Sequence, residues 1–178
     1  MGSGQAVNLK NYTTEVPTST TIFRVQQFLI KAGVSQIAMD YGLDGSVSAI
    51  TFSLQLEAKK RPVMVRLPAN VDGALEALWR QRCEGGRLNS DRDICTYKNG
   101  KWLKKESLRE HASRVAWRLV QDWIEVQLSM VAMKQADFLQ VFLPYAWDGR
   151  QTFYDRLKGG GFKLLEAPKQ EGEVVEAR

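Results

Sequence analysis

The chain has 178 residues and a formal net charge of +5 at pH 7, with 44% hydrophobic and 25% charged residues. This length suffices for one well-buried core, and the balance of residue types is ordinary for a globular protein. No apolar run approaches the roughly 20 residues of a membrane-spanning helix, and the first residues lack the apolar core of a signal peptide. We therefore expect no membrane association, and the positive charge favours an acidic partner.

The N-terminal part of the chain predicts an extended lead-in followed by a helix. Residues 1–17 are polar and end at a proline. Apolar residues then recur at helical spacing over about residues 20–32, which predicts an amphipathic helix. Ser19 or Thr20 would cap it, because either hydroxyl can accept a hydrogen bond from a free backbone N–H of the first turn. Gly33 lies where a left-handed helix end is expected.

The next stretch changes from helical to strand periodicity. Apolar and polar residues alternate over 46–56, which predicts a strand with one buried face, and shorter strands are expected over 36–41 and 62–67. A second helix is predicted over residues 72–82, with Asn70 or Asp72 at its start. The order α-β-β-β-α predicts an α+β fold, a two-layer sandwich of an antiparallel sheet and helices.

The second half of the chain predicts a long helix and then short ones. The motif Ser107-Leu-Arg-Glu110 has the form of a capping box and would open a helix that continues to about Met133. Short helices are expected over residues 137–143 and 152–158. We therefore predict one α+β domain over residues 18–158, followed by a flexible, acidic tail over residues 159–178.

Signatures of catalysis and metal binding are missing from the sequence. There is no Walker-type phosphate loop, no G-x-S-x-G motif and no H-E-x-x-H motif. The only histidine, His111, has no nucleophile beside it, which favours a packing or surface role over a general base. Asp91 and Asp93, like Asp40 and Asp44, lack a third spaced carboxylate, so we interpret them as loop acids. We expect no enzyme, no cofactor and no metal.

The two cysteines also argue against a metal site. Cys83 and Cys95 are twelve residues apart and belong to no C-x-x-C pair. One disulfide is compatible with this spacing. Two reduced thiols in a cytoplasmic protein are the favoured interpretation, because disulfides are rare in reducing compartments.

The excess of positive charge is concentrated in residues 80–105. This segment contains eight cations and three acids, and its net charge of +5 equals that of the whole chain. The pair Asn99-Gly100 predicts a hairpin turn within it, and Tyr97 and Trp102 lie among the cations. One interpretation is a solvated loop, and the other is a phosphate-binding surface on which an aromatic ring stacks or anchors. The candidate binding residues are Arg87, Arg92, Lys98, Lys101, Trp102, Lys104 and Lys105.

Two further features bear on partners. Arg109, Arg114 and Arg118 would extend the basic strip along the long helix, although Arg118 and Asp122 are equally well placed for an ordinary i,i+4 ion pair. The aromatic segment 142–147 is favoured as part of the core, and its alternative role is an exposed patch for homodimerisation, because aromatic residues are common interface hot spots.

Two stretches of the chain resemble small proteins encoded by phages and prophages. The first comprises residues 21–41 and the segment VRLPAN at 65–70, and the second comprises RVAWRLVQDW at 114–123 and FLPY at 142–145. The resemblance covers most of residues 20–157. This set of proteins, mostly of unknown function, is similar to one that contains a type II-A anti-CRISPR protein, an inhibitor of Cas9. The shared residues are largely of core type and imply a common fold, and they identify no binding residue.

The resemblance implies a non-enzymatic phage protein that acts in the cytoplasm of a bacterial host and inhibits an RNA-guided nuclease. A DNA mimic that fills the basic channel of Cas9 should be strongly acidic, and this chain is basic. We would therefore expect it to contact the Cas9–guide RNA complex, or its DNA, through a basic face. The alternative is a phage DNA-binding protein of replication or recombination, which would use the same residues. A third interpretation is a structural dimer whose basic loop binds nothing specific.

Overall fold

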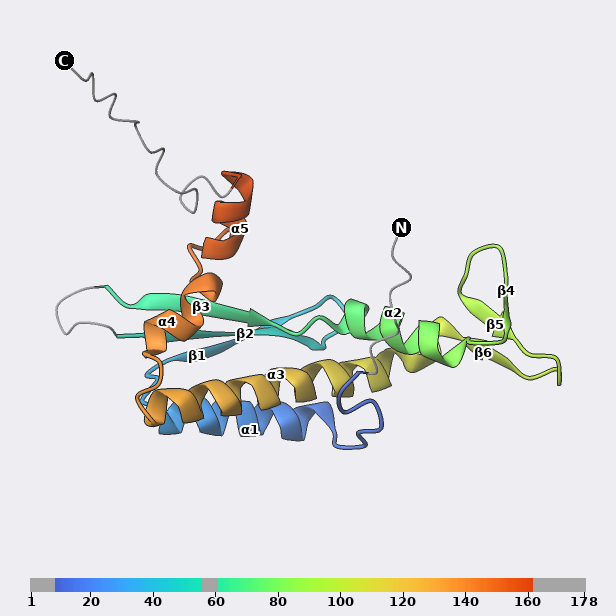
Figure 1. Ribbon diagram of the computed structural model, residues 1–178, viewed down its shortest axis with the longest axis horizontal. Coiled ribbons are helices and arrows are strands. Elements are labelled where there is room, and N and C mark those ends of the chain that lie inside the picture. Colours follow the sequence, from blue (N-terminus) through green and yellow to red (C-terminus); the bar gives the residue numbers. More distant parts are fainter. Residues whose placement is uncertain (1–8, 56–60, 162–178) are drawn as a thin grey trace, which may run out of the picture.

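The computed structural model describes residues 9–55 and 61–161 (Figure 1). The end of the predicted second strand and most of the predicted acidic tail lie outside these residues. The helices are α1 (Thr18–Lys31), α2 (Val71–Arg82), α3 (Arg109–Ala132), α4 (Phe138–Phe142) and α5 (Phe153–Gly159), with 3₁₀ turns η1 (Lys105–Leu108) and η2 (Leu143–Tyr145). The strands are β1 (Ile37–Tyr41), β2 (Val47–Leu54), β3 (Val63–Pro68), β4 (Arg87–Leu88), β5 (Ile94–Thr96) and β6 (Trp102–Lys104).

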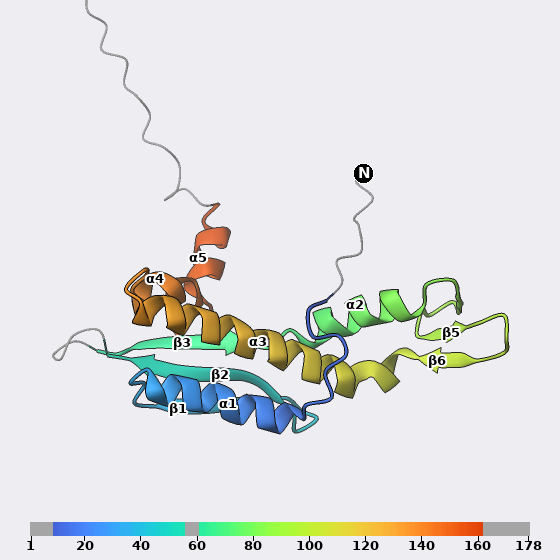
Figure 2. The ribbon, with the colours of Figure 1, turned by 60° about the horizontal axis from the view of Figure 1, so that its bottom comes forward.

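The first sheet is antiparallel, with the order β1-β2-β3. Phe52 of β2 lies opposite Ile37 of β1 and Val65 of β3, so apolar residues of all three strands share one face. Helices α1 and α3 lie side by side along this sheet (Figures 1 and 2). The predicted α+β class, with a long helix after the strands, is confirmed. Among the described residues, no helix is long and apolar enough to cross a bilayer.

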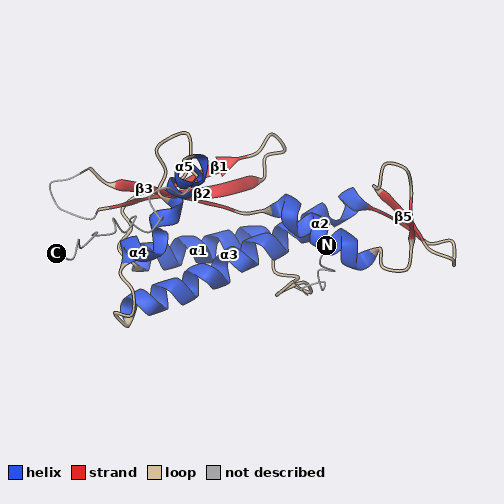
Figure 3. Cartoon of the chain, turned by 45° about the horizontal axis from the view of Figure 1, so that its top comes forward, coloured by secondary structure: helices blue, strands red, loops and turns tan. Residues whose placement is uncertain are grey.

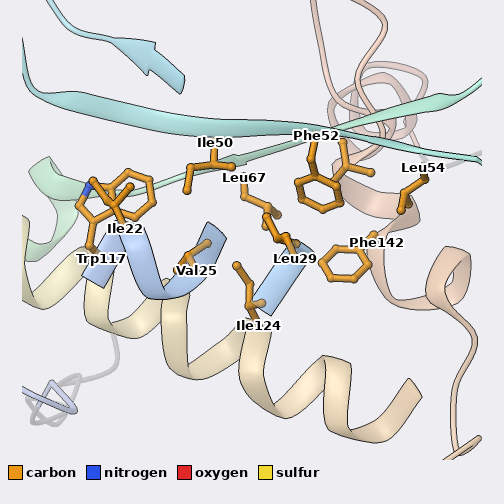
Figure 4. Packing of buried hydrophobic residues seen from close by; sticks show 11 residues of the cluster. Ile22, Val25, Leu29, Ile50, Phe52, Leu54, Leu67, Trp117, Ile124 and Phe142 are labelled. Atoms are coloured by element: carbon orange, nitrogen blue, oxygen red, sulfur yellow. The ribbon is translucent and has the colours of Figure 1, made fainter. Parts of the chain in front are cut away.

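The main core lies between this sheet and the two helices (Figure 4). Val25 and Leu29 of α1 are fully buried against the apolar face of the sheet, together with Trp117 of α3. The indole Nε1 of Trp117 donates a hydrogen bond to the carbonyl of Val47, 3.2 Å away, so the buried polar atom of this large side chain is satisfied. Phe142 of α4 also belongs to this core, where its ring packs edge-on against Phe52 of β2 with ring centres 5.5 Å apart.

Helix α2 lies beyond the first sheet and packs on the first half of α3. Leu75 and Leu78 of α2 form a second cluster with Ala112 and Val115 of α3. Of the two residues predicted at the start of α2, Asn70 is the cap, since its side chain accepts a hydrogen bond from the backbone N–H of Gly73 in the first turn. The helical layer over the sheet is therefore made by α1 and α3, whereas α2 extends the molecule. At the far end, strands β4–β6 form a second, smaller sheet (Figure 3).

Two predicted helix caps are wrong. Helix α1 begins two residues earlier than expected, directly after Pro17, and neither Ser19 nor Thr20 caps it. Helix α3 begins at Arg109 without a side-chain cap. The 3₁₀ turn η1 directly precedes α3, so Ser107 lacks the extended conformation of an N-cap residue. Its hydroxyl instead donates a hydrogen bond to the backbone carbonyl of Lys104.

Candidate nucleic-acid interface

The basic segment folds into a three-stranded antiparallel sheet with the order β4-β5-β6. The predicted turn at Asn99-Gly100 connects β5 to β6, and Gly100 has a φ of +78°, a left-handed conformation that suits glycine. The backbone N–H of Tyr97 donates to the carbonyl of Lys101 across the base of this turn, at 2.8 Å. The segment therefore forms an ordered antiparallel sheet and not an irregular loop.

One face of this sheet carries two of the candidate cations, Arg87 and Lys104, and the aromatic ring of Trp102. Arg87, Thr96 and Trp102 lie opposite one another across the three strands, and paired residues of neighbouring strands share a face. Lys104 and the half-buried Ile94 lie on the same face, two residues along their strands. We call these five residues the basic face. The side chain of Trp102 is 63% exposed, and Lys104 Nζ lies 5.8 Å from the centre of its ring.

The opposite face anchors the sheet to the end of α2. It carries Leu88, Cys95 and Leu103, of which Cys95 is fully buried. A Cβ on Gly86 would overlap the Sγ atom of Cys95, so the chain leaving α2 can approach β5 this closely only with glycine at this position. The hydroxyl of Tyr97 donates to a carbonyl in the last turn of α2. The basic face therefore points away from the helix that supports it.

The two cysteines are free thiols that lie beside one another. Cys95 Sγ is 3.9 Å from the backbone carbonyl of Cys83. Burial, together with a hydrogen bond to Cys95, raises the pKa of the Cys83 thiol to about 12. Cys83 is therefore a poor nucleophile and a poor metal ligand near neutral pH. No group of three or more metal-binding side chains occurs among residues 9–55 and 61–161.

Most of the candidate binding cations make no ion pair among the described residues. The side-chain charges of four exposed residues make no ion pair within the part of the chain that the structure describes: Arg87, Arg92, Lys98 and Lys101. Lys105 differs, because its half-buried ammonium pairs with Glu76 of α2. Lys105 therefore helps to fix the sheet on α2, and the remaining cations are available for a partner.

The loop between β4 and β5 carries Arg92 at the edge of a cleft of about 560 Å³ that it forms with α2. The side-chain oxygen of Asn89 accepts hydrogen bonds from the backbone N–H groups of Asp93 and Ile94, both at 3.0 Å. Asp93 is therefore part of the loop framework, as expected of a loop acid. Arg92 lies at the corner of this loop. Its φ of +58° is in the left-handed region, which is uncommon for residues other than glycine.

The basic strip does not continue along α3. Each of its three arginines is paired with acids, in the ion pairs Arg109–Asp72 at 3.0 Å, Arg114–Glu110 at 2.5 Å and Arg118–Asp122 at 3.4 Å. Their charges are largely neutralised, so the strip of unpaired cations does not extend along this helix. The packing role predicted for His111 agrees with its Nε2 atom, which lies 2.6 Å from the carbonyl oxygen of Tyr12 in the N-terminal segment.

The aromatic segment at 142–147 belongs mainly to the core. Phe142 is fully buried, and the ring of Tyr145 packs against Trp123 with ring centres 5.3 Å apart. The guanidinium of Arg66 lies over the ring of Trp147, 5.1 Å from its centre. The segment therefore offers little exposed aromatic surface for a dimer contact, and homodimerisation stays a prediction.

No family model matches the chain, and no significant match to it occurs among curated proteins or solved structures. The function of this protein is therefore inferred from the geometry of the second sheet. The sequence identified its charges and its turn but missed the row that joins Arg87 to Trp102. The short alternations Ile94-Cys95-Thr96 and Trp102-Leu103-Lys104 are the signal that could have revealed this row.

Proposed function

We propose that this protein is a non-enzymatic module that binds a partner containing nucleic acid through the basic face and the adjoining hairpin tip. The observation that carries the proposal is the exposed ring of Trp102, which has Lys104 Nζ 5.8 Å from its centre and Arg87 in the same row of the sheet. Neither cation makes an ion pair among the described residues. Unpaired arginines and lysines bind phosphates and release condensed counterions, and an aromatic ring adds affinity for bases.

The resemblance to the phage set favours a specific form of this function, in which the partner is a guide-loaded Cas9-type nuclease and the protein inhibits it. The distribution of charge supports contact with RNA or DNA exposed on that complex. Lys98 and Lys101 flank the tip of the hairpin, where they can reach phosphates recessed in a protein surface. Binding there would block a conformational step or access of DNA.

A mobility-shift titration with single-stranded DNA, duplex DNA and guide-loaded Cas9, each at two salt concentrations, tests this proposal. We expect the loaded nuclease to be bound and its cleavage of DNA to be inhibited. Tight binding to free DNA without inhibition would instead make the protein a DNA-binding module of phage replication or recombination. Failure to bind any of the three probes would contradict the proposed function in both forms.

Charge reversals locate the contact. Lys98→Glu with Lys101→Glu should abolish binding, because two attractive phosphate contacts become repulsive. The matched control is Arg24→Glu with Arg150→Glu, two exposed arginines outside the second sheet that also make no ion pair among the described residues. The control should bind like the unmodified protein. Equal loss in both variants would show a general charge effect and no site at the hairpin.

A further inference from the structure

We infer that the basic face binds a single-stranded segment of nucleic acid, with one unpaired base stacked on Trp102 and the flanking phosphates held by Arg87 and the hairpin lysines. This inference rests on the proposed function and specifies which form of nucleic acid the site accepts. Its support is the row across β4, β5 and β6, which places a large exposed ring and a guanidinium on one flat surface.

The floor between these two residues suits a sugar–phosphate chain. Neighbouring strands lie about 4.8 Å apart, so the backbones at Arg87 and Trp102 are separated by about 10 Å across β5. Thr96 fills the middle of the row with a small, exposed side chain. A base lying on the indole can therefore extend its backbone over Thr96 towards Arg87 without meeting a bulky residue.

The exposure of Trp102 is the observation that separates single strands from duplexes. In a duplex, both faces of each base are already stacked and only the base edges are accessible, so an indole ring finds no π-face to cover. An unpaired base offers that face. The contact between Lys104 and the indole is long, at 5.8 Å, so the lysine can give way to a base and turn to a phosphate.

The main alternative is a β-ribbon inserted into the major groove of a duplex. That mode uses two strands, because the groove is only about 12 Å wide. Here β4 adds a third strand, and its Arg87 would be forced against the groove wall. The three-stranded platform therefore fits an open surface better than a groove, and binding to a duplex is treated as the contrary outcome of the test.

The fluorescence of the protein provides a direct readout of stacking. Among the five tryptophans, only Trp102 is exposed: Trp79 and Trp117 are buried, and Trp123 and Trp147 are half-buried. A base stacked on Trp102 should therefore quench the exposed part of the emission. In the Trp102→Tyr variant, this quenching should disappear while binding is retained, because tyrosine also stacks.

The experiment titrates the full chain with a twelve-nucleotide oligo(dT) and with a duplex hairpin of equal charge. We expect the single strand to bind more tightly, and Trp102→Ala to raise its Kd by about 5- to 150-fold, the range found for loss of one base–aromatic stack. Trp102→Tyr should stay within a few-fold of the unmodified protein. The control Tyr41→Ala removes an equally exposed ring from the first sheet and should leave the Kd unchanged.

The outcomes separate the inference from the proposed function. If the duplex binds as tightly as the single strand and Trp102→Ala changes neither Kd, the inference is overturned while nucleic-acid binding stands. If neither oligonucleotide binds and guide-loaded Cas9 binds with no effect of Trp102→Ala, the inference is again overturned and the inhibitor function stands. If none of the probes binds, the inference and the proposed function are both overturned. Circular dichroism of each variant verifies that the helices remain folded.

Discussion

Gly86→Ala offers a way to disturb the basic face without changing any charge. An added Cβ would overlap Cys95 Sγ, and it would also lie 3.3 Å from Tyr97 Cε1 and 3.4 Å from the carbonyl oxygen of Cys83. Cys95 is fully buried, so its sulfur has little room to move away. Overpacking of this kind typically costs about 1–3 kcal/mol. We expect the loss to appear first in the second sheet, which rests on this contact.

The sulfur of Cys95 can be removed to test this cause. Cys95→Ala alone should cost about 1 kcal/mol, because it leaves a small cavity. In the double variant the new methyl group occupies the vacated space, so the combined cost should fall below the sum of the single costs by about 1–2 kcal/mol, a coupling expected only between contacting residues.

Amide hydrogen exchange of residues 94–96 and 102–104 measures this cost locally. A loss of about 2 kcal/mol corresponds to exchange about 30-fold faster in Gly86→Ala, with partial recovery of protection in the double variant. Affinity for nucleic acid should follow the same order. Strictly additive effects, or a Gly86→Ala variant that exchanges like the unmodified protein, would refute the role assigned to this close approach.

Three other predictions concern the rest of the chain. Asp122→Asn removes the carboxylate that holds Lys10 Nζ at 2.8 Å and should cost about 1–2 kcal/mol, with faster hydrogen exchange over residues 9–13. Burial opposes ionisation of Asp122, but hydrogen bonds from Lys10 and Asn11 outweigh it and lower its pKa, so its stabilising effect should fade in urea titrations as the pH falls below about 4. Trp117→Phe leaves the Val47 carbonyl without its buried donor and should cost about 2–3 kcal/mol in urea unfolding. The raised pKa of Cys83 predicts slow alkylation by iodoacetamide at pH 8, and stability that falls from pH 9 towards pH 12 as the unfolded thiol ionises first.

The elements of this fold were predictable where periodicity is local. The alternation over β2 and the helical spacing in α1 and α3 identify the main sheet and the helices that cover it, because one buried face imposes a regular pattern. The placement of α2 was not predictable. Its apolar residues fit either the sheet or another helix, and only the three-dimensional structure shows that they meet Ala112 and Val115 of α3.

The site was predictable in its charge but not in its shape. Strands of two or three residues, such as β4 and β6, are too short to show a clear alternation, so the sequence revealed a turn and a set of cations without the sheet that orders them. The roles of the individual cations also required the structure. Lys105 and Lys98 look alike in sequence, yet Lys105 is held by Glu76 from a helix 29 residues earlier in the chain.

The arrangement of the two cores suggests how the position of the basic face is controlled. Helix α3 contributes to both clusters, so it links the first sheet to the helix that carries the second sheet. The ion pairs at this junction are largely exposed, as in Arg109–Asp72, and exposed pairs contribute only about 0–1 kcal/mol each. The apolar contact of Leu75 and Leu78 with α3 must therefore supply most of the rigidity. A large-to-small change such as Leu78→Ala should consequently weaken binding at the basic face by loosening its support, whereas changes on the face itself should leave both cores intact.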